Sequence, residues 1–365
     1  MPGIRYEIDH SSGIPLGGIG TGTIEIRPDG YFHEWQIFNR GSWAQESGET
    51  SCPAGPGPAQ GALSFFLRWQ AGDERPQVRR LGLRSDQHDL YHLPWLRSVS
   101  AIEFEGRYPT ARLRYLDPSM PMSVSALAFS PFIPHAARQS ATPGFYLSFA
   151  VENQSHEPLQ VALLSVLENP LTPEGAGYRP AATAVSESDT TTRVTLQTEG
   201  SSPDDPLAGS LCLSASGDRL SWISGASRAY VRGFKHRPSA FVRTHQCLQH
   251  LFRRDGALPN LGTSKPPASL PHEDELASMD EPSQRALLAE FLQIPSFHDL
   301  YHRLAEIEPD LLHTSAGRRA LLAEGLTLLR ILDAESAGWG DMALCSALTL
   351  SPGERREVLV TLSWH

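Results

Sequence analysis

The sequence predicts a mainly β protein, built as an antiparallel β-sandwich with a helical insertion near residues 283–333. Short segments of alternating hydrophobic and polar residues follow one another between residues 98 and 168, and turn-forming residues separate them. Helical spacing replaces this alternation near residues 283–333. A large all-β domain can reach 365 residues, so we expect residues 1–365 to form one domain that includes the insertion.

Residues 11–41 are expected to form a tightly folded loop that leads into a hairpin, because five glycines precede a strand, a turn and an aromatic run. The glycines are Gly13, Gly17, Gly18, Gly20 and Gly22. Residues 23–27 alternate as a strand does, and Pro28-Asp29-Gly30 predicts a tight turn, because proline presets φ and glycine adopts positive φ. The aromatic run at residues 31–38 predicts the second strand of a β-hairpin.

Further short strands are predicted through the middle of the chain. After a loop rich in Gly, Pro and Ser at residues 42–61, they are expected at residues 62–69, 98–105, 111–116, 122–129, 144–153 and 159–167. The last two are expected to pair as a hairpin across residues 154–158. Residues 170–210 are polar and weakly patterned, with strand-like runs at 194–197 and 211–215.

The last part of the chain changes character twice. Residues 256–282 are rich in Gly, Pro, Ser, Asp and Glu, which predicts a loop. Residues 286–292 and 318–329 carry good helix formers at helical spacing, so two or three helices are expected among the strands. Two final strands are predicted at 339–350 and 356–365, joined by a turn.

Composition narrows the functional class. The formal net charge is −10 and the pI is about 5.8, whereas a nucleic-acid-binding domain normally carries a basic patch. No stretch approaches the roughly 20 apolar residues of a membrane span, and no signal-peptide pattern is visible. Cysteines occur at Cys52, Cys212, Cys247 and Cys345 without a CxxC pair, which is typical of reduced thiols. We therefore expect a cytoplasmic protein with no nucleic-acid partner and no transmembrane segment.

Two patterns of this sequence resemble ligand sites. The glycine cluster fits neither G-x-G-x-x-G nor the P-loop, and a strand rather than a helix follows it. The pentapeptide His-Asp-Leu-Tyr-His occurs at residues 88–92 and 298–302, and on a helix its two histidines would share a face, as zinc ligands do. Asp299 stands where the zinc motif has Glu, and no third ligand is evident. We expect no metal and no cofactor.

Several ordered blocks together resemble the N-terminal domain of glycoside hydrolase family 116, the family of non-lysosomal glucosylceramidases and related β-glucosidases. Residues 13–24 read GIPLGGIGTGTI and residues 30–39 read GYFHEWQIFN, which match the family's GxPLGGIGxGxI and GxFxxWQ(I/L)FN signatures. The blocks GRYPTA at 106–111, FSPFIP at 129–134 and SATP at 140–143 follow in the family's order.

The resemblance implies a supersandwich-like β-sandwich placed before a large catalytic (α/α)6 barrel. In the family a strand ending in Trp-His closes the N-terminal domain, and this sequence stops on Trp364-His365. We therefore expect a piece of a longer protein, with the C-terminal catalytic domain after residue 365 as its partner. The implied substrate, reached through that domain, is a β-glucoside or a glucosylceramide-like lipid, and this chain alone is expected to be inactive.

The carboxylates of this chain are not expected to perform the hydrolysis. A retaining β-glucosidase needs two carboxyl groups about 5–5.5 Å apart. The resemblance implies that both lie in the barrel, so no catalytic residue is assigned here. Asp29 and Glu34 flank the aromatic hairpin as local candidates, although structural or solvated carboxylates are the commoner case. A stand-alone carbohydrate-binding or structural β-sandwich module is the alternative function.

The candidate substrate-binding residues are His33, Trp35 and Arg40. Aromatic faces and a bidentate guanidinium suit sugars and other polar groups. The resemblance adds weight to these three residues, because the N-terminal domain of such enzymes packs beside the barrel. Trp35 has a competing role in core or domain-interface packing.

Overall fold

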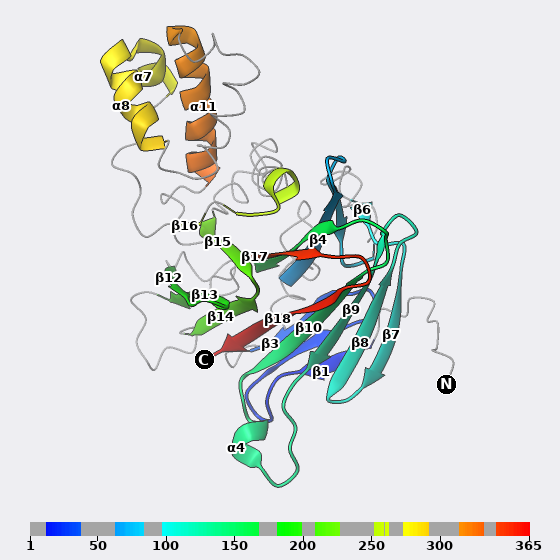
Figure 1. Cartoon of the computed structure of the whole chain (residues 1–365). Helices are drawn as coiled ribbons and strands as arrows, with labels where there is room; N and C mark the ends of the chain where they lie inside the picture. Colours follow the sequence, from blue (N-terminus) through cyan, green and yellow to red (C-terminus); the bar gives the residue numbers. More distant parts are fainter. Residues whose placement is uncertain are drawn as a thin grey trace.

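The structure is a computed structural model that describes residues 12–37, 63–83, 97–167, 181–198, 209–226, 252–258, 260–262, 273–291, 314–331 and 341–365. Two large sheets and one small three-stranded sheet make up most of it (Figure 1). The predicted mainly β, sandwich-like fold is confirmed.

The first large sheet has eight strands in the order β12-β13-β14-β18-β10-β9-β8-β7, and all neighbours are antiparallel. The strands are β7 (Ala101–Arg107), β8 (Thr110–Leu116), β9 (Met122–Phe129), β10 (Gly144–Asn153), β12 (Ala181–Glu187), β13 (Thr191–Thr198), β14 (Ser210–Ser216) and β18 (Arg355–Trp364). Every second residue of β9 is buried, as expected for a sheet with one face on the core.

The second large sheet has seven strands in the order β16-β15-β17-β11-β4-β5-β6. The strands are β4 (Leu63–Ala71), β5 (Gln77–Arg80), β6 (Arg97–Ser98), β11 (Leu159–Leu167), β15 (Arg219–Ala226), β16 (Leu261–Gly262) and β17 (Asp341–Leu350). Only the short edge strands β6 and β16 pair in parallel. The central strand β11 is buried on both faces, because one face meets the main core and the other packs with Phe252 and Leu258.

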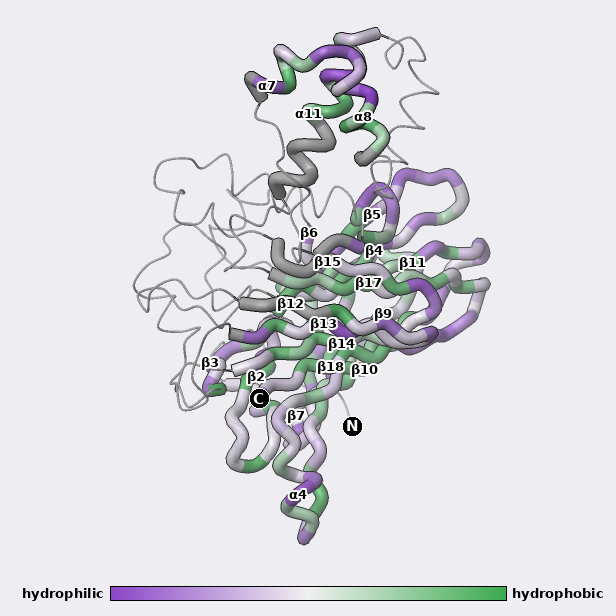
Figure 2. Tube along the Cα trace, turned by 90° about the vertical axis from the view of Figure 1, so that its left-hand side faces the viewer, coloured by the Kyte–Doolittle hydropathy of each residue, from purple (hydrophilic) through white to green (hydrophobic). Residues whose placement is uncertain are grey.

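Aromatic side chains join the sheets into one core. Phe65 of β4 and Phe149 of β10 have ring centroids 4.7 Å apart, which links the two large sheets. The small sheet consists of β1 (Ile14–Leu16), β2 (Thr23–Ile26) and β3 (Phe32–Gln36). Phe32 of β3 lies 6.1 Å from Phe65 and 5.6 Å from Phe145. Figure 2 shows the resulting pattern, with hydrophobic residues along central strands and hydrophilic residues at many of the connections.

The predicted hairpin across residues 154–158 is wrong. β10 pairs with β9 and β18, whereas β11 pairs with β4 and β17, so the chain crosses from one large sheet to the other. The turn predicted between the last two strands lies at residues 351–354 and makes a second crossing, because it connects β17 in one large sheet to β18 in the other. Local alternation identified these strands, but it carries no information about which neighbour each strand pairs with.

The side chain of Asn153 ties the two crossings together. This residue is 0% exposed. Its Nδ2 donates to the carbonyl oxygens of Leu350 at 3.0 Å and Glu157 at 2.8 Å. The Asn153 backbone N–H donates to the Glu354 carbonyl at 3.0 Å, and its carbonyl accepts from the Gly353 N–H at 2.9 Å. One buried residue therefore satisfies backbone groups of both crossings.

A second polar contact joins the large sheets. Nε of Arg79, on β5, donates to Oδ2 of Asp117, which follows β8, at 2.9 Å. The backbone N–H and hydroxyl of Ser119 donate to Oδ1 at 2.8 and 2.6 Å. Burial raises the pKa of Asp117, but the hydrogen bonds from Ser119 and Arg79 and the Arg79 charge outweigh it. The pKa of Asp117 is therefore below its ordinary value of 3.8.

Residues 252–255 are helical, and the other helices described are α4 (Ala137–Ser140), α7 (Glu273–Ser278), α8 (Glu281–Phe291) and α11 (Ser315–Ile331). The last two confirm the helices predicted within residues 283–333, and α11 contacts both α7 and α8. The loop predicted at 256–282 is wrong in part, because α7 lies within it and buries Leu276. Its polar composition hid this helix. None of the described helices is long and apolar enough to cross a membrane.

Replacing Asn153 with Ala should lower the free energy of unfolding by about 2–3 kcal/mol, because buried carbonyl groups of both crossings lose their donor. Urea unfolding of the purified chain measures this. Gln154→Ala, at an exposed neighbouring position, is the control and should change the free energy by less than about 0.5 kcal/mol. Equal effects of the two variants would contradict the assigned role of Asn153.

Asp117→Asn should lower stability at neutral pH by about 1–2 kcal/mol and should weaken the acid dependence of unfolding. The folded-state pKa of Asp117 is lowered, so its contribution is present above pH 3.8 and is lost as the pH falls through the folded-state value. Urea midpoints measured from pH 7 down to pH 2 test this. Glu103→Gln, which breaks the exposed pair with Arg114, should leave the curve unchanged.

Candidate functional site

The candidate site is the outer face of the β2–β3 hairpin. Gly30 closes the turn at φ +84°, and its N–H donates to the Arg27 carbonyl at 3.0 Å. Ile24, Ile26 and Phe32 point into the core and are at most 2% exposed. The opposite face of the hairpin is polar. The alternation of the two strands therefore places apolar side chains toward the core and polar side chains on the outer face.

A β-bulge at Glu34 decides which side chains reach that face. Thr23 pairs with Gln36 and Glu25 pairs with His33, so β3 has one residue more than β2 between these pairs. Glu34 has φ +48°, which is uncommon for a residue with a Cβ. The extra residue lets His33 and Glu34 both remain partly exposed, and it turns the next residue, Trp35, inward.

His33 and Asp29 form a hydrogen-bonded pair at the turn. Nε2 of His33 lies 2.9 Å from Oδ2 of Asp29, and the carboxylate can only accept, so the ring donates. Asp29 is 4% exposed, and its Oδ1 accepts from the Tyr31 N–H at 2.9 Å. The Asp29 carbonyl accepts from the Leu83 N–H at 2.8 Å. Asp29 therefore fixes the orientation of the His33 ring through Nε2.

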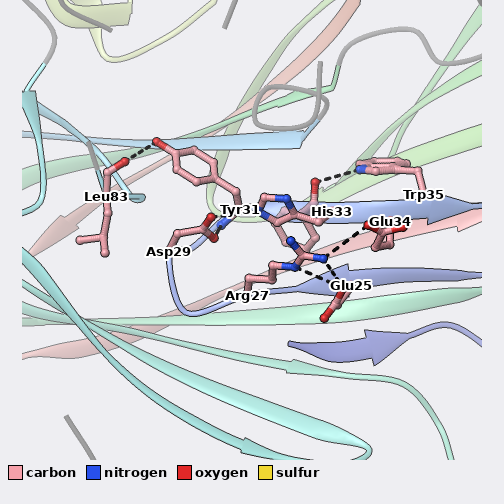
Figure 3. A network of polar contacts seen from close by, with 9 residues as sticks. Glu25, Arg27, Asp29, Tyr31, His33, Glu34, Trp35 and Leu83 are labelled. Atoms are coloured by element: carbon pink, nitrogen blue, oxygen red, sulfur yellow. Dashed lines mark hydrogen bonds and ion pairs between the residues drawn. The ribbon is translucent and has the colours of Figure 1, made fainter. Parts of the chain in front are cut away.

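Arg27 organises the rest of the polar face. Its Nη2 lies 2.9 Å from Oε2 of Glu25 and 3.4 Å from Oε1 of Glu34 (Figure 3). The Arg27 side chain is 16% exposed, and the Glu34 side chain is 28% exposed. Arg27 thus holds two carboxylates from adjacent strands. Sequence analysis missed Glu25 and Arg27, although their alternation with Ile24 and Ile26 places them on the outer face.

The three predicted substrate-binding residues have different positions. His33 lies on the polar face, with its side chain 12% exposed. Trp35 is 0% exposed within the hydrophobic core, and its indole N–H donates to the Phe32 carbonyl at 3.0 Å. Arg40 lies outside the described residues. Of the three, His33 is the residue that the structure places beside other polar side chains.

The described residues offer few side chains for metal binding or for thiol chemistry. They contain no group of three or more His, Cys, Asp or Glu side chains placed to hold a metal ion. Both copies of the pentapeptide, at 88–92 and 298–302, lie outside the described ranges, as do Cys52 and Cys247. Burial raises the pKa of the Cys345 thiol to about 12, so this side chain stays protonated. Cys212 is a second free cysteine.

The segments that carry the sequence resemblance meet at one end of the molecule. The Gly17 N–H donates to Oγ of Ser130 at 2.7 Å, and the Ile19 N–H donates to the Ser140 carbonyl at 2.8 Å. A Cβ on Gly18 would lie 2.4 Å from the Thr142 carbonyl oxygen, so only glycine allows this approach. The indole N–H of Trp364 donates to the Thr21 carbonyl at 2.6 Å.

A family model described as beta-glucosidase 2, glycosyl-hydrolase family 116 N-term, matches residues 13–280. The chain belongs to this family. The match includes the glycine loop and the hairpin of the candidate site, and it confirms the resemblance found in the sequence.

No curated protein matches the chain. One similar solved structure is a polysaccharide lyase with 12% sequence identity and a TM-score of 0.37. The alignment covers 95% of this chain but 33% of the lyase chain, so this chain spans about a third of that length.

The positive φ at Glu34 limits which residues this family 116 N-terminal domain can carry at the bulge. Glu34→Val should destabilise the domain by about 1–2 kcal/mol more than Glu34→Gly, because glycine accepts φ +48° and a β-branched residue does not. Both variants lose the contact with Arg27, so their difference isolates the backbone. Gln36→Val, at an exposed position of the same strand, is the control and should cost little. Equal urea midpoints for the two Glu34 variants would show that the bulge is not strained.

Proposed function

We propose that this chain is the non-catalytic N-terminal domain of a retaining β-glucosidase or glucosylceramidase-type glycoside hydrolase. In this proposal a catalytic (α/α)6 barrel follows it in the parent protein, and the domain buttresses that barrel. The observation that carries the proposal is the family match over residues 13–280. The free thiols of Cys212 and Cys345 support a cytoplasmic location, because reduced cysteines are usual there.

The local carboxylates support a non-catalytic role. Asp29 is 4% exposed and is held by the Tyr31 N–H and the His33 ring. Glu34 contacts the Arg27 guanidinium. A nucleophile and an acid/base catalyst must both reach one glycosidic bond. These two carboxylates instead stabilise the turn and the bulge of the hairpin.

We also propose that the polar face of the hairpin borders the sugar site of the parent enzyme. His33 would hydrogen-bond a sugar hydroxyl through Nδ1, while Asp29 holds the ring. Arg40 is proposed as a second contact. The packing of Trp35 in the core supports a positioning role, in which the indole fixes the strand that carries His33.

Activity measurements test the non-catalytic role. Purified residues 1–365 should not hydrolyse an aryl β-glucoside, whereas the complete parent protein should do so. In that parent, Glu34→Gln should retain most of the activity, since Glu34 is not assigned to the chemistry. If residues 1–365 do hydrolyse the substrate, and Asp29→Asn or Glu34→Gln abolishes that turnover, the proposal is overturned. If the chain is inactive, has no barrel after it and binds sugar in calorimetry, the stand-alone binding module is favoured instead.

His33→Ala in the parent protein should raise KM for an aryl β-glucoside several-fold and change kcat less, because a hydrogen bond to the bound sugar is lost. His156→Ala, at an exposed position in the crossing between β10 and β11, is the matched control and should change neither constant. If both variants behave like the wild type, His33 does not contact the sugar.

A further inference from the structure

Four large apolar side chains are exposed together at one end of the molecule. In the described residues the exposed large hydrophobic residues are Ile19 at 56%, Ile133 at 50%, Tyr108 at 49%, Phe132 at 42% and Leu359 at 41%. All but Leu359 belong to three segments that meet there, residues 17–22, 106–110 and 130–143. We name these four residues the apolar tip. Figure 1 shows that α4 and the chain flanking it project beyond the ends of the strands.

The backbone that carries the apolar tip is held by hydrogen bonds. The Ser140 hydroxyl is buried, accepts from the Ile133 N–H at 2.9 Å and donates to the Ile133 carbonyl at 3.0 Å. The Ser140 carbonyl accepts from the Ile19 N–H at 2.8 Å. The rings of Tyr108 and Phe132 contact edge to face, with centroids 5.6 Å apart. A backbone fixed in this way loses little conformational entropy when a partner covers the side chains it carries.

The charge around the apolar tip limits what can cover it. Residues 17–22, 106–110 and 130–143 contain Arg107 and Arg138 but no Asp or Glu, although the whole chain has 41 acidic and 31 basic residues. Next to these segments, the exposed side chain of Arg107 lies 3.9 Å from the exposed carboxylate of Glu105. A second copy docking through the same surface would oppose arginine with arginine. A protein surface that is apolar and edged by carboxylates is complementary to it.

The last strand ends beside the apolar tip. The Trp364 N–H donates to the Pro143 carbonyl at 3.0 Å, directly after the projecting segment, and its indole N–H donates to the Thr21 carbonyl in the glycine loop. A polypeptide that continues beyond His365 in a parent protein would therefore begin next to this surface. Covalent attachment at such a short distance would give the attached domain a high effective concentration there.

We propose that the apolar tip is the surface on which the C-terminal catalytic domain docks, through an apolar patch edged by carboxylates. The inference rests on the proposed function, which supplies that domain, and it adds the residues of the contact. The side chains of Phe132 and Ile133 are the anchors of the interface, and Arg107 and Arg138 form its charged rim.

Hydroxyl-radical footprinting tests the surface directly, by comparing residues 1–365 with the complete parent protein. Oxidation of Tyr108, Phe132 and Ile133 should be several-fold slower in the parent, whereas Leu359 should react equally in both. Protection elsewhere on the domain with an unprotected apolar tip would overturn this inference and leave the proposed function standing. No added protection at any position, or a parent that ends at residue 365, would overturn both.

Variants provide a second test. Phe132→Ser combined with Ile133→Ser should lower the Tm of the parent by more than it lowers the Tm of residues 1–365, because these side chains are about half exposed in the isolated chain and would be covered in the parent. Leu359→Ser should affect neither protein. Equal Tm values for the variant and wild-type parents would overturn the inference. A vesicle assay distinguishes a membrane surface. If residues 1–365 cosediment with phosphatidylcholine–phosphatidylserine vesicles and the double variant does not, the apolar tip binds a membrane and the inference is overturned.

Discussion

The paired crossings at Asn153 constrain the rest of the sandwich. β10 and β18 are neighbours in one large sheet, and their continuations β11 and β17 are neighbours in the other. The two strands therefore pass between sheets side by side, and the register of one pair is coupled to the register of the other. Because a one-residue slip would turn every core side chain outward, the buried amide of Asn153 helps fix both inner faces.

The hairpin of the candidate site depends on that core. Phe32 packs against Phe145 of the eight-stranded sheet and Phe65 of the seven-stranded sheet, so β3 is anchored where the two sheets meet. The bulge at Glu34 then allows Trp35 to point inward while His33 remains on the outer face. A rigid packing face and a polar outer face are thus combined within one five-residue strand.

Much of the fold could be predicted from local sequence. The alternation at 122–129 and the turn at Pro28-Asp29-Gly30 have local physical causes, and both predictions are confirmed. The partner of β11 could not be predicted, because pairing is set by contacts between residues distant in sequence. The helix α7 was missed because polar composition alone suggested a loop.

The candidate site was predictable to a smaller extent. Aromatic and polar residue types pointed to the hairpin, but the orientation of Trp35 depends on a bulge that shifts the alternation by one residue. The three-residue spacing between Phe32 and Trp35, both buried, was the available signal for that bulge. The contacts between Arg27 and the two carboxylates follow from strand pairing, which the sequence does not reveal directly.

The central claim is that this family 116 N-terminal domain serves a catalytic barrel in a longer protein. Reading the gene beyond codon 365 tests it most directly. We expect an open reading frame of several hundred codons that encodes a helix-rich domain carrying a Glu and a distant Asp as its catalytic pair. A stop codon immediately after codon 365 would contradict the claim and would identify the chain as a binding or structural domain in its own right.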